Sequence, residues 1–165
     1  MDIKKDCKCM FLRIPSFYRN LDVIEEHLDI FRKHKELWIM KMGKKPDQDY
    51  LEEVIKNNGG LIIKKASKFG NQFYFAKLES ISPNNKVIYP EYYNEIFKNM
   101  NKKLEDTFED SVWFKVTEIY KLTMDDVGTF VTKKGTSLYE AATHLYQVSY
   151  MYVNAKHSIK LKEVV

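Results

Sequence analysis

The chain has 165 residues, of which 44% are hydrophobic and 30% charged, and its formal net charge is +4. This composition is typical of one globular domain that buries a core without disulfide or metal staples. No apolar run reaches the roughly 18 residues that a membrane-spanning helix needs, and the N-terminus is charged where a signal peptide would turn apolar. We therefore expect a cytoplasmic protein with no membrane partner.

Strand and helix patterns alternate in the first half of the chain. Residues 9–14 form a predicted strand, which Pro15 ends. Asp22 and Glu25 resemble a capping box, and apolar residues then recur at three- and four-residue spacing, which predicts a helix ending near His34. The next predicted elements are a strand at 36–42, a helix from 49 to about 57, and strands at 61–66 and 72–81 that a Gly-Asn loop joins as a hairpin.

A second set of elements is predicted beyond the hairpin. Pro90 suits the first turn of a helix that continues to Leu104, because the missing N–H of proline needs no partner there. Aromatic and β-branched residues favour a strand at 112–120. The last predicted elements are a helical turn capped by Thr123 and Asp126, a strand at 129–133, a short helix at 137–144, and strands at 147–153 and 158–164.

The order of these elements predicts an α+β fold. Helices do not separate the strands regularly, which disfavours a doubly wound parallel sheet. We expect a small twisted, mainly antiparallel, β-barrel-like sheet flanked by helices, since closure hides the edges of many short strands. No repeat or linker divides the chain, so residues 1–165 form a single predicted domain.

Few residues indicate metal chemistry or catalysis. Cys7 and Cys9 cannot supply the four ligands of a structural zinc site, and we expect free thiols, no metal and no cofactor. His27 lies beside the apolar stripe of its helix and is interpreted as a surface or boundary histidine. Gly43-Lys44-Lys45 lacks the other residues of a phosphate-binding loop, and no nucleophile elbow or dinucleotide motif occurs. A nucleophilic site assembled in space stays open, but no catalytic residue is assigned and a non-enzymatic protein is favoured.

Aromatic residues alternate with lysines on several predicted strands, and this pattern favours binding. Trp38 precedes Lys41, and Trp113 precedes Lys115. A nucleic-acid base can stack on an aromatic face while a lysine neutralises a nearby phosphate. Half-buried strands with snorkelling lysines share this pattern, so for any one of these aromatic residues core packing is the favoured interpretation.

Lysines are concentrated in one third of the chain. Those assigned to contacts with a nucleic-acid backbone are Lys44, Lys45, Lys64, Lys65 and Lys68. The small positive net charge permits such a partner without demanding it. A solvated surface is the alternative role for these lysines.

Four segments together resemble the strand succession of the PUA-like superfamily, above all its EVE and ASCH branches. They are Leu37-Trp-Ile-Met-Lys41, Gly60-Leu-Ile-Ile-Lys-Lys-Ala-Ser67, Phe73-Tyr-Phe-Ala-Lys-Leu-Glu79 and Trp113-Phe-Lys-Val-Thr-Glu-Ile-Tyr-Lys-Leu122. The resemblance covers roughly residues 36 to 122. Two departures are that Met42-Gly43-Lys44 replaces the Ser-Glu-Pro that often follows the EVE lysine, and that a whole helix precedes the first matching strand.

The resemblance implies a pocket in a small β-barrel that accepts a flipped or modified base. In such a pocket Trp38 would stack on the base, Lys41 would contact an acceptor or phosphate, and Ser67 would hydrogen-bond a base edge. Trp113 would form a further aromatic wall. Base extrusion has a cost, so modified or already unpaired nucleotides would be favoured.

The leading hypothesis is a non-catalytic nucleic-acid-binding module with a pocket for a flipped or modified base. DNA and RNA are both open as partners, and the sequence does not specify the oligomeric state. The alternative is a protein-interaction or structural domain without a nucleic-acid ligand. An ASCH-like nucleotide-processing hydrolase ranks third.

Overall fold

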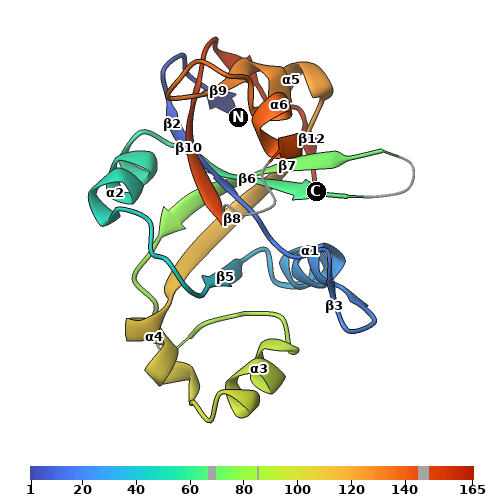
Figure 1. The fold of residues 1–165 in the computed structure, drawn as a ribbon, viewed down its shortest axis with the longest axis vertical. Coiled ribbons are helices and arrows are strands. Elements are labelled where there is room, and N and C mark those ends of the chain that lie inside the picture. The colour runs from blue at the N-terminus through green and yellow to red at the C-terminus, as the bar shows by residue number, and fades with distance from the viewer. Residues whose placement is uncertain (67–69, 85, 145–148) are drawn as a thin grey trace.

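A computed structural model describes residues 1–66, 70–84, 86–144 and 149–165 (Figure 1). Its main feature is an eight-stranded sheet in which β12, β8, β7, β6, β2, β10 and β9 are neighbours in that order, while β5 also pairs with β8. The bounds of these strands are β2 Lys8–Leu12, β5 Leu37–Lys41, β6 Gly60–Lys65, β7 Gln72–Ser80, β8 Val112–Leu122, β9 Phe130–Thr132, β10 Tyr150–Ala155 and β12 Glu163–Val164.

All strand pairs in this sheet are antiparallel except β2 with β6, which is parallel. The parallel pair is possible because the long connection between these strands, residues 13–59, contains two helices and three short strands and brings the chain back in the same direction. Across the described residues β9 and β12 are the two ends of the pairing order, and the sheet does not close. The predictions of an α+β fold and a mainly antiparallel sheet are confirmed.

Helices and the chain termini cover both faces and both ends of the sheet (Figure 1). In the view of Figure 1, α3 and α4 lie at the lower end, whereas α5, α6 and the N-terminal segment lie at the upper end. The bounds of the helices are α1 Val23–His34, α2 Gln48–Lys56, α3 Tyr93–Asn99, α4 Thr107–Asp110, α5 Met124–Thr129 and α6 Leu138–His144, with a 3-10 turn at Leu104–Asp106.

Local sequence signals explain where several helices begin. The side chain of Asp22 accepts a hydrogen bond from the Glu25 amide at the start of α1, as the capping pattern predicts. Thr123 and Asp126 form a reciprocal capping box at the start of α5. The cap at Thr123 is confirmed in full and that at Asp22 in part, because the Glu25 side chain pairs with Lys65 and Arg32 instead of completing a capping box.

Buried side chains lie on both faces of the sheet because successive strand residues point to opposite sides. Phe73 and Phe75 pack on the face that α5 and α6 cover, whereas Tyr74 and Ala76 pack on the face of α1 and α2. A third, aromatic cluster lies beneath α3 and contains Trp38, Tyr93, Phe97 and Trp113. The continuous apolar run of β7 therefore reflects burial on both faces.

Some predicted elements differ from the structure. The helix expected from Pro90 to Leu104 ends at Asn99, because the chain turns at Asn101 with a φ of 53°. The last expected strand divides into β11 (Ile159–Lys160), which pairs with β1 (Asp2–Ile3), and β12. A small hairpin of β3 (Phe17–Tyr18) and β4 (Leu21–Asp22) was not predicted.

The predicted hairpin of β6 and β7 is confirmed, since Gly60 to Lys65 pair in register with Lys77 to Gln72. Its loop residues 67–69 lie outside the described part of the chain, as do residues 147 and 148 of a later predicted strand. Within the described residues, no helix has the length and apolar character needed to cross a membrane.

Candidate functional site

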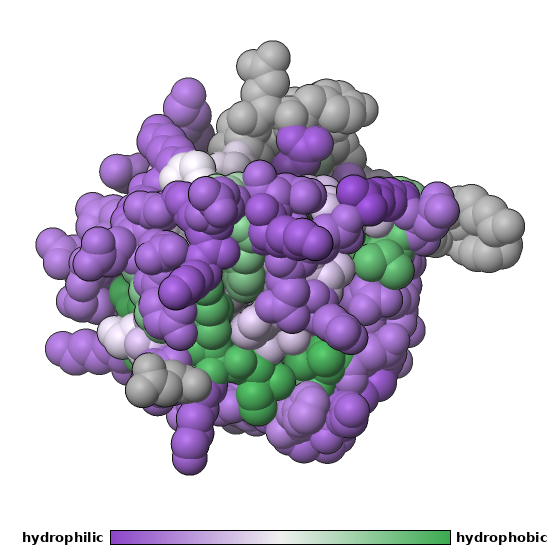
Figure 2. Space-filling view, turned by 90° about the horizontal axis from the view of Figure 1, so that it is seen from below, coloured by the Kyte–Doolittle hydropathy of each residue, from purple (hydrophilic) through white to green (hydrophobic). Residues whose placement is uncertain are grey.

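A cavity of about 530 Å³ opens between the end of β2, the β3–β4 hairpin, α1, β5 and α3. Figure 2, which views the molecule from the end that carries α3 and α4, shows several apolar areas within a largely hydrophilic face. The volume falls in the range of known small-molecule pockets. The cavity is therefore the candidate binding site.

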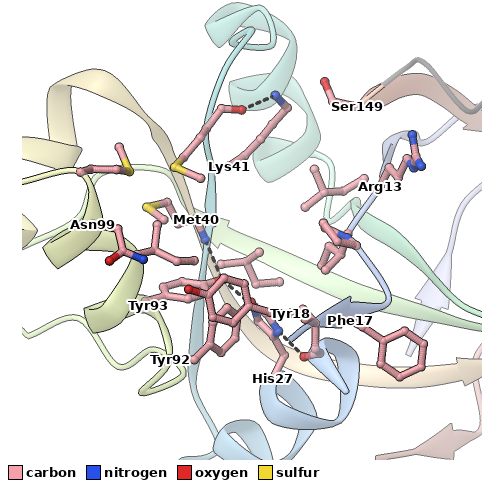
Figure 3. Close-up of a pocket in the computed structure, with 18 residues that line it drawn as sticks. Arg13, Phe17, Tyr18, His27, Met40, Lys41, Tyr92, Tyr93, Asn99 and Ser149 are labelled. Atoms are coloured by element: carbon pink, nitrogen blue, oxygen red, sulfur yellow. Dashed lines mark hydrogen bonds between the residues drawn. The ribbon is translucent and has the colours of Figure 1, made fainter. Parts of the chain in front are cut away.

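Aromatic rings form one end of this cavity (Figure 3). Tyr18 of the hairpin stacks on Tyr92 with ring centroids 5.3 Å apart, and Tyr92 lies edge-on to Tyr93 at 5.0 Å. His27 lies edge-on to both Tyr92 and Tyr93. These rings, held against one another by three separate elements, offer an apolar surface suited to a planar ligand.

A short hydrogen-bond chain fixes the inner wall of the aromatic end. The Nδ1 of His27 lies 2.7 Å from the Val23 carbonyl, and its Nε2 lies 2.5 Å from the Tyr93 hydroxyl. The Tyr93 hydroxyl also accepts a hydrogen bond from the Met40 amide at 3.2 Å. The consistent assignment is that Nδ1–H donates to the carbonyl and the tyrosine O–H donates to Nε2, so His27 is neutral.

Burial supports that protonation state. The His27 side chain is 4% exposed, and loss of hydration lowers its pKa to about 4. Burial likewise raises the pKa of Tyr93 well above its usual value. Both ring nitrogens of His27 are engaged, so this residue joins α1 to α3 and, through Tyr93, to β5. The expectation of a surface or boundary histidine was wrong, because the helix face that carries His27 is covered by Tyr92 and Tyr93.

The opposite end of the cavity is polar and cationic, with Arg13, Lys41 and Ser149 (Figure 3). Lys41 is only 7% exposed, and burial lowers its pKa. Its ammonium donates to the carbonyls of Met42 and Lys44 and lies 5.2 Å from the Tyr150 ring. No carboxylate among the described residues forms an ion pair with it. A buried cation in this setting attracts an anionic ligand group.

Trp38 and Trp113 lie in the core and do not line the cavity. Their side chains are 2% and 1% exposed and pack beneath α3. Trp38 and Lys41 point to opposite faces of β5, since they are three residues apart on a strand. The Trp113 indole N–H donates to Thr107, which holds the start of α4. The core-packing alternative therefore describes both indoles.

The described lysines that were assigned to a nucleic-acid backbone come from two strands that are not neighbours in the sheet, β6 and the end of β5. Lys44 and Lys45 are exposed beyond β5, and the Lys45 ammonium donates to the Glu109 carbonyl. Lys64 and Lys65 are half-buried on β6, and Lys65 pairs with Glu25 at 2.5 Å and with Asp22 at 3.7 Å. Lys65 therefore neutralises the acidic start of α1. Ser67 and Lys68 lie outside the described residues.

No other chemistry is evident at the site. Throughout the part of the chain that the structure describes, no group of three histidine, cysteine, aspartate or glutamate side chains could hold a metal ion. Cys7 and Cys9 are buried, free thiols away from the cavity. Tyr18, Tyr92 and Arg13 were not predicted as site residues, because they come from three segments whose proximity no local pattern encodes.

Comparisons with known proteins do not assign the chain to a family: no family model, curated protein or solved structure matches it.

Proposed function

We propose that the protein is a non-catalytic nucleic-acid-binding module whose cavity accepts a flipped or modified base. The observation that carries this proposal is the division of the cavity into an aromatic end and a cationic end. A nucleotide has the same division, with a planar base joined to an anionic phosphate. The base would lie against Tyr18 and Tyr92, and the phosphate would lie toward Lys41 and Arg13.

The arrangement of the four resembling segments supports a PUA-like fold as part of the same proposal. These segments correspond to β5, β6, β7 and β8, which are consecutive neighbours in the order β5, β8, β7, β6. The proposal includes that the sheet curls toward a barrel. Within it Lys41 keeps its role, whereas the tyrosines take the stacking role first given to Trp38 and Trp113.

Replacing Lys41 tests the proposal directly. Lys41→Met keeps the length of the side chain and removes its charge, and should weaken oligonucleotide binding by about tenfold or more, the usual effect of losing a charge-assisted hydrogen bond. The slope of the logarithm of the binding constant against the logarithm of the salt concentration should become shallower by the amount expected for about one phosphate contact. Fluorescence anisotropy with oligonucleotides carrying modified and unmodified bases, at several salt concentrations, measures both quantities.

Lys98→Met is the matched control, because Lys98 is exposed on α3 and does not line the cavity. This variant should bind within about twofold of the wild type, as expected of a surface charge outside the site. The proposal is wrong if no oligonucleotide binds at low salt. It is equally wrong if binding survives the combined Lys41→Met and Tyr92→Leu change in a protein that still folds.

A further inference from the structure

Three large apolar side chains stand exposed around the mouth of the cavity. Phe17, Met42 and Met100 are 66%, 43% and 38% exposed, and all three line the cavity. They come from the β3–β4 hairpin, the end of β5 and the end of α3. Apolar residues gathered at one opening mark an interaction surface, whereas scattered ones need no explanation.

The most exposed of the three, Phe17, is presented on a braced support. Its neighbour Tyr18 stacks on Tyr92, and Arg19 at the turn forms an ion pair with Glu95 of α3 at 2.5 Å. Figure 3 shows the phenyl ring of Phe17 pointing away from the cluster of tyrosines. Tyr18 and Arg19 therefore hold the hairpin against α3, whereas Phe17 faces outward.

We propose that Phe17 enters a nucleic-acid duplex beside the base that occupies the cavity and fills the space that this base leaves. The inference rests on the proposed function and adds the duplex as its partner. Removing a base from a stack leaves an apolar gap, and exposed Phe, Leu or Met side chains are the groups that fill such gaps.

The charges near the mouth favour a polyanion at this position. Arg13 and Lys41 line the cavity, and Lys44 and Lys45 follow Met42 along the chain. The acidic first turn of α1 lies next to the hairpin, but Glu25 is paired with both Lys65 and Arg32. The carboxylate of Glu95 is engaged by Arg19. Glu26 of the same turn lies near Tyr92 at the aromatic end, so the duplex backbone would pass on the opposite, cationic side of the mouth.

The Phe17→Ala variant distinguishes binding of a duplex from binding of a single strand. We expect the affinity of this variant for a single-stranded oligonucleotide to fall much less than its affinity for the duplex, because the base still reaches the tyrosines of the cavity. Its affinity for the duplex of the same sequence should fall by about tenfold, in line with the loss of one stacking contact. With 2-aminopurine at the target position, the rise in fluorescence on binding should be large for the wild-type protein and small for Phe17→Ala.

Two control variants sharpen this experiment. Phe17→Trp retains a stacking side chain and should retain duplex binding. Leu21→Ala removes another exposed apolar side chain of the same hairpin that does not line the cavity, and should leave duplex binding unchanged.

The possible failures can be told apart. Suppose that the wild-type protein binds the single strand. If Phe17→Ala then binds the duplex as tightly as the wild type does, or loses affinity for the duplex and the single strand equally, the role of Phe17 is refuted and the base pocket stands. If the wild-type protein binds neither substrate, the proposed function fails and the inference fails with it. Phe17→Ala should melt like the wild type, since the ring is exposed.

Discussion

Lys41 and Trp38 lie on the same short strand and have opposite environments. Lys41 borders the cavity, whereas Trp38 packs in the aromatic cluster beneath α3. Alternation along β5 places the two side chains on opposite faces, and their positions along the strand matter as well, since Met40 shares the face of Trp38 but lies nearer the cavity and lines it. A basic and an aromatic residue close in sequence are therefore not necessarily partners in one site.

Trp38→Ala tests whether the indole is a core residue. We expect the free energy of unfolding to fall by about 3 to 5 kcal/mol, the usual cost of removing a large buried aromatic side chain. Urea denaturation followed by circular dichroism measures this change. Phe17→Ala is the matched aromatic control and should change stability by less than about 0.5 kcal/mol, because its ring is exposed. A Trp38→Ala protein as stable as the wild type would place the indole in an open pocket instead.

At the scale of elements, the β3–β4 hairpin shows why part of the site escaped prediction. Each of its strands has two residues, so no periodic pattern is long enough to be recognised. Its position depends on the Tyr18–Tyr92 stack and the Arg19–Glu95 ion pair, both of which connect it to α3. An element of this kind is defined by its tertiary contacts.

The strand β6 depends on a glycine at its first residue. A Cβ atom on Gly60 would lie 2.2 Å from the Ala76 carbonyl oxygen and 2.8 Å from the Phe75 ring, so β6 and β7 approach too closely for any side chain there. We expect Gly60→Ala to destabilise the protein by about 3 kcal/mol, the upper range for forced overpacking. Thermal and urea unfolding measure the change.

Gly128→Ala is the control for that substitution. Gly128 lies in α5, where an added Cβ atom meets nothing within 4 Å. Alanine has the higher helix propensity, so this variant should be as stable as the wild type or slightly more stable. A mild effect of Gly60→Ala, similar to that of Gly128→Ala, would contradict the close approach of β6 and β7.

At the scale of the whole molecule, the contacts of His27 link the cavity to global stability. This side chain is neutral when folded, with a pKa of about 4 against 6.5 as the ordinary value. Between these two values the unfolded chain binds more protons than the folded one, so stability rises with pH across that window and is lost as pH falls from about 6.5 toward 4. The contribution of His27 to the free energy of unfolding should be about 2 to 3 kcal/mol smaller at pH 4.5 than at pH 7.

Urea unfolding at several pH values measures this contribution. His27→Gln removes the titrating group, so the stability of this variant should depend less on pH than that of the wild type, by about that same amount. His157→Gln, which replaces an exposed histidine after β10, is the control for the loss of a histidine outside the cavity. Parallel profiles for His27→Gln and the wild type would show that His27 is not held neutral.

The sequence by itself determined most elements of the molecule and its α+β class. Caps at Asp22 and Thr123, the apolar period of α1 and the β6–β7 hairpin are local signals, and each acts over a few residues. The sequence also singled out Lys41 at the end of an apolar strand, and the structure places it in the lining of the cavity. Tertiary structure alone decided that the indoles are core and that the cavity is formed by tyrosines, His27 and Arg13 from segments far apart in sequence. The physical reason is that burial and proximity depend on which helix covers which face of the sheet, and no local pattern specifies that arrangement.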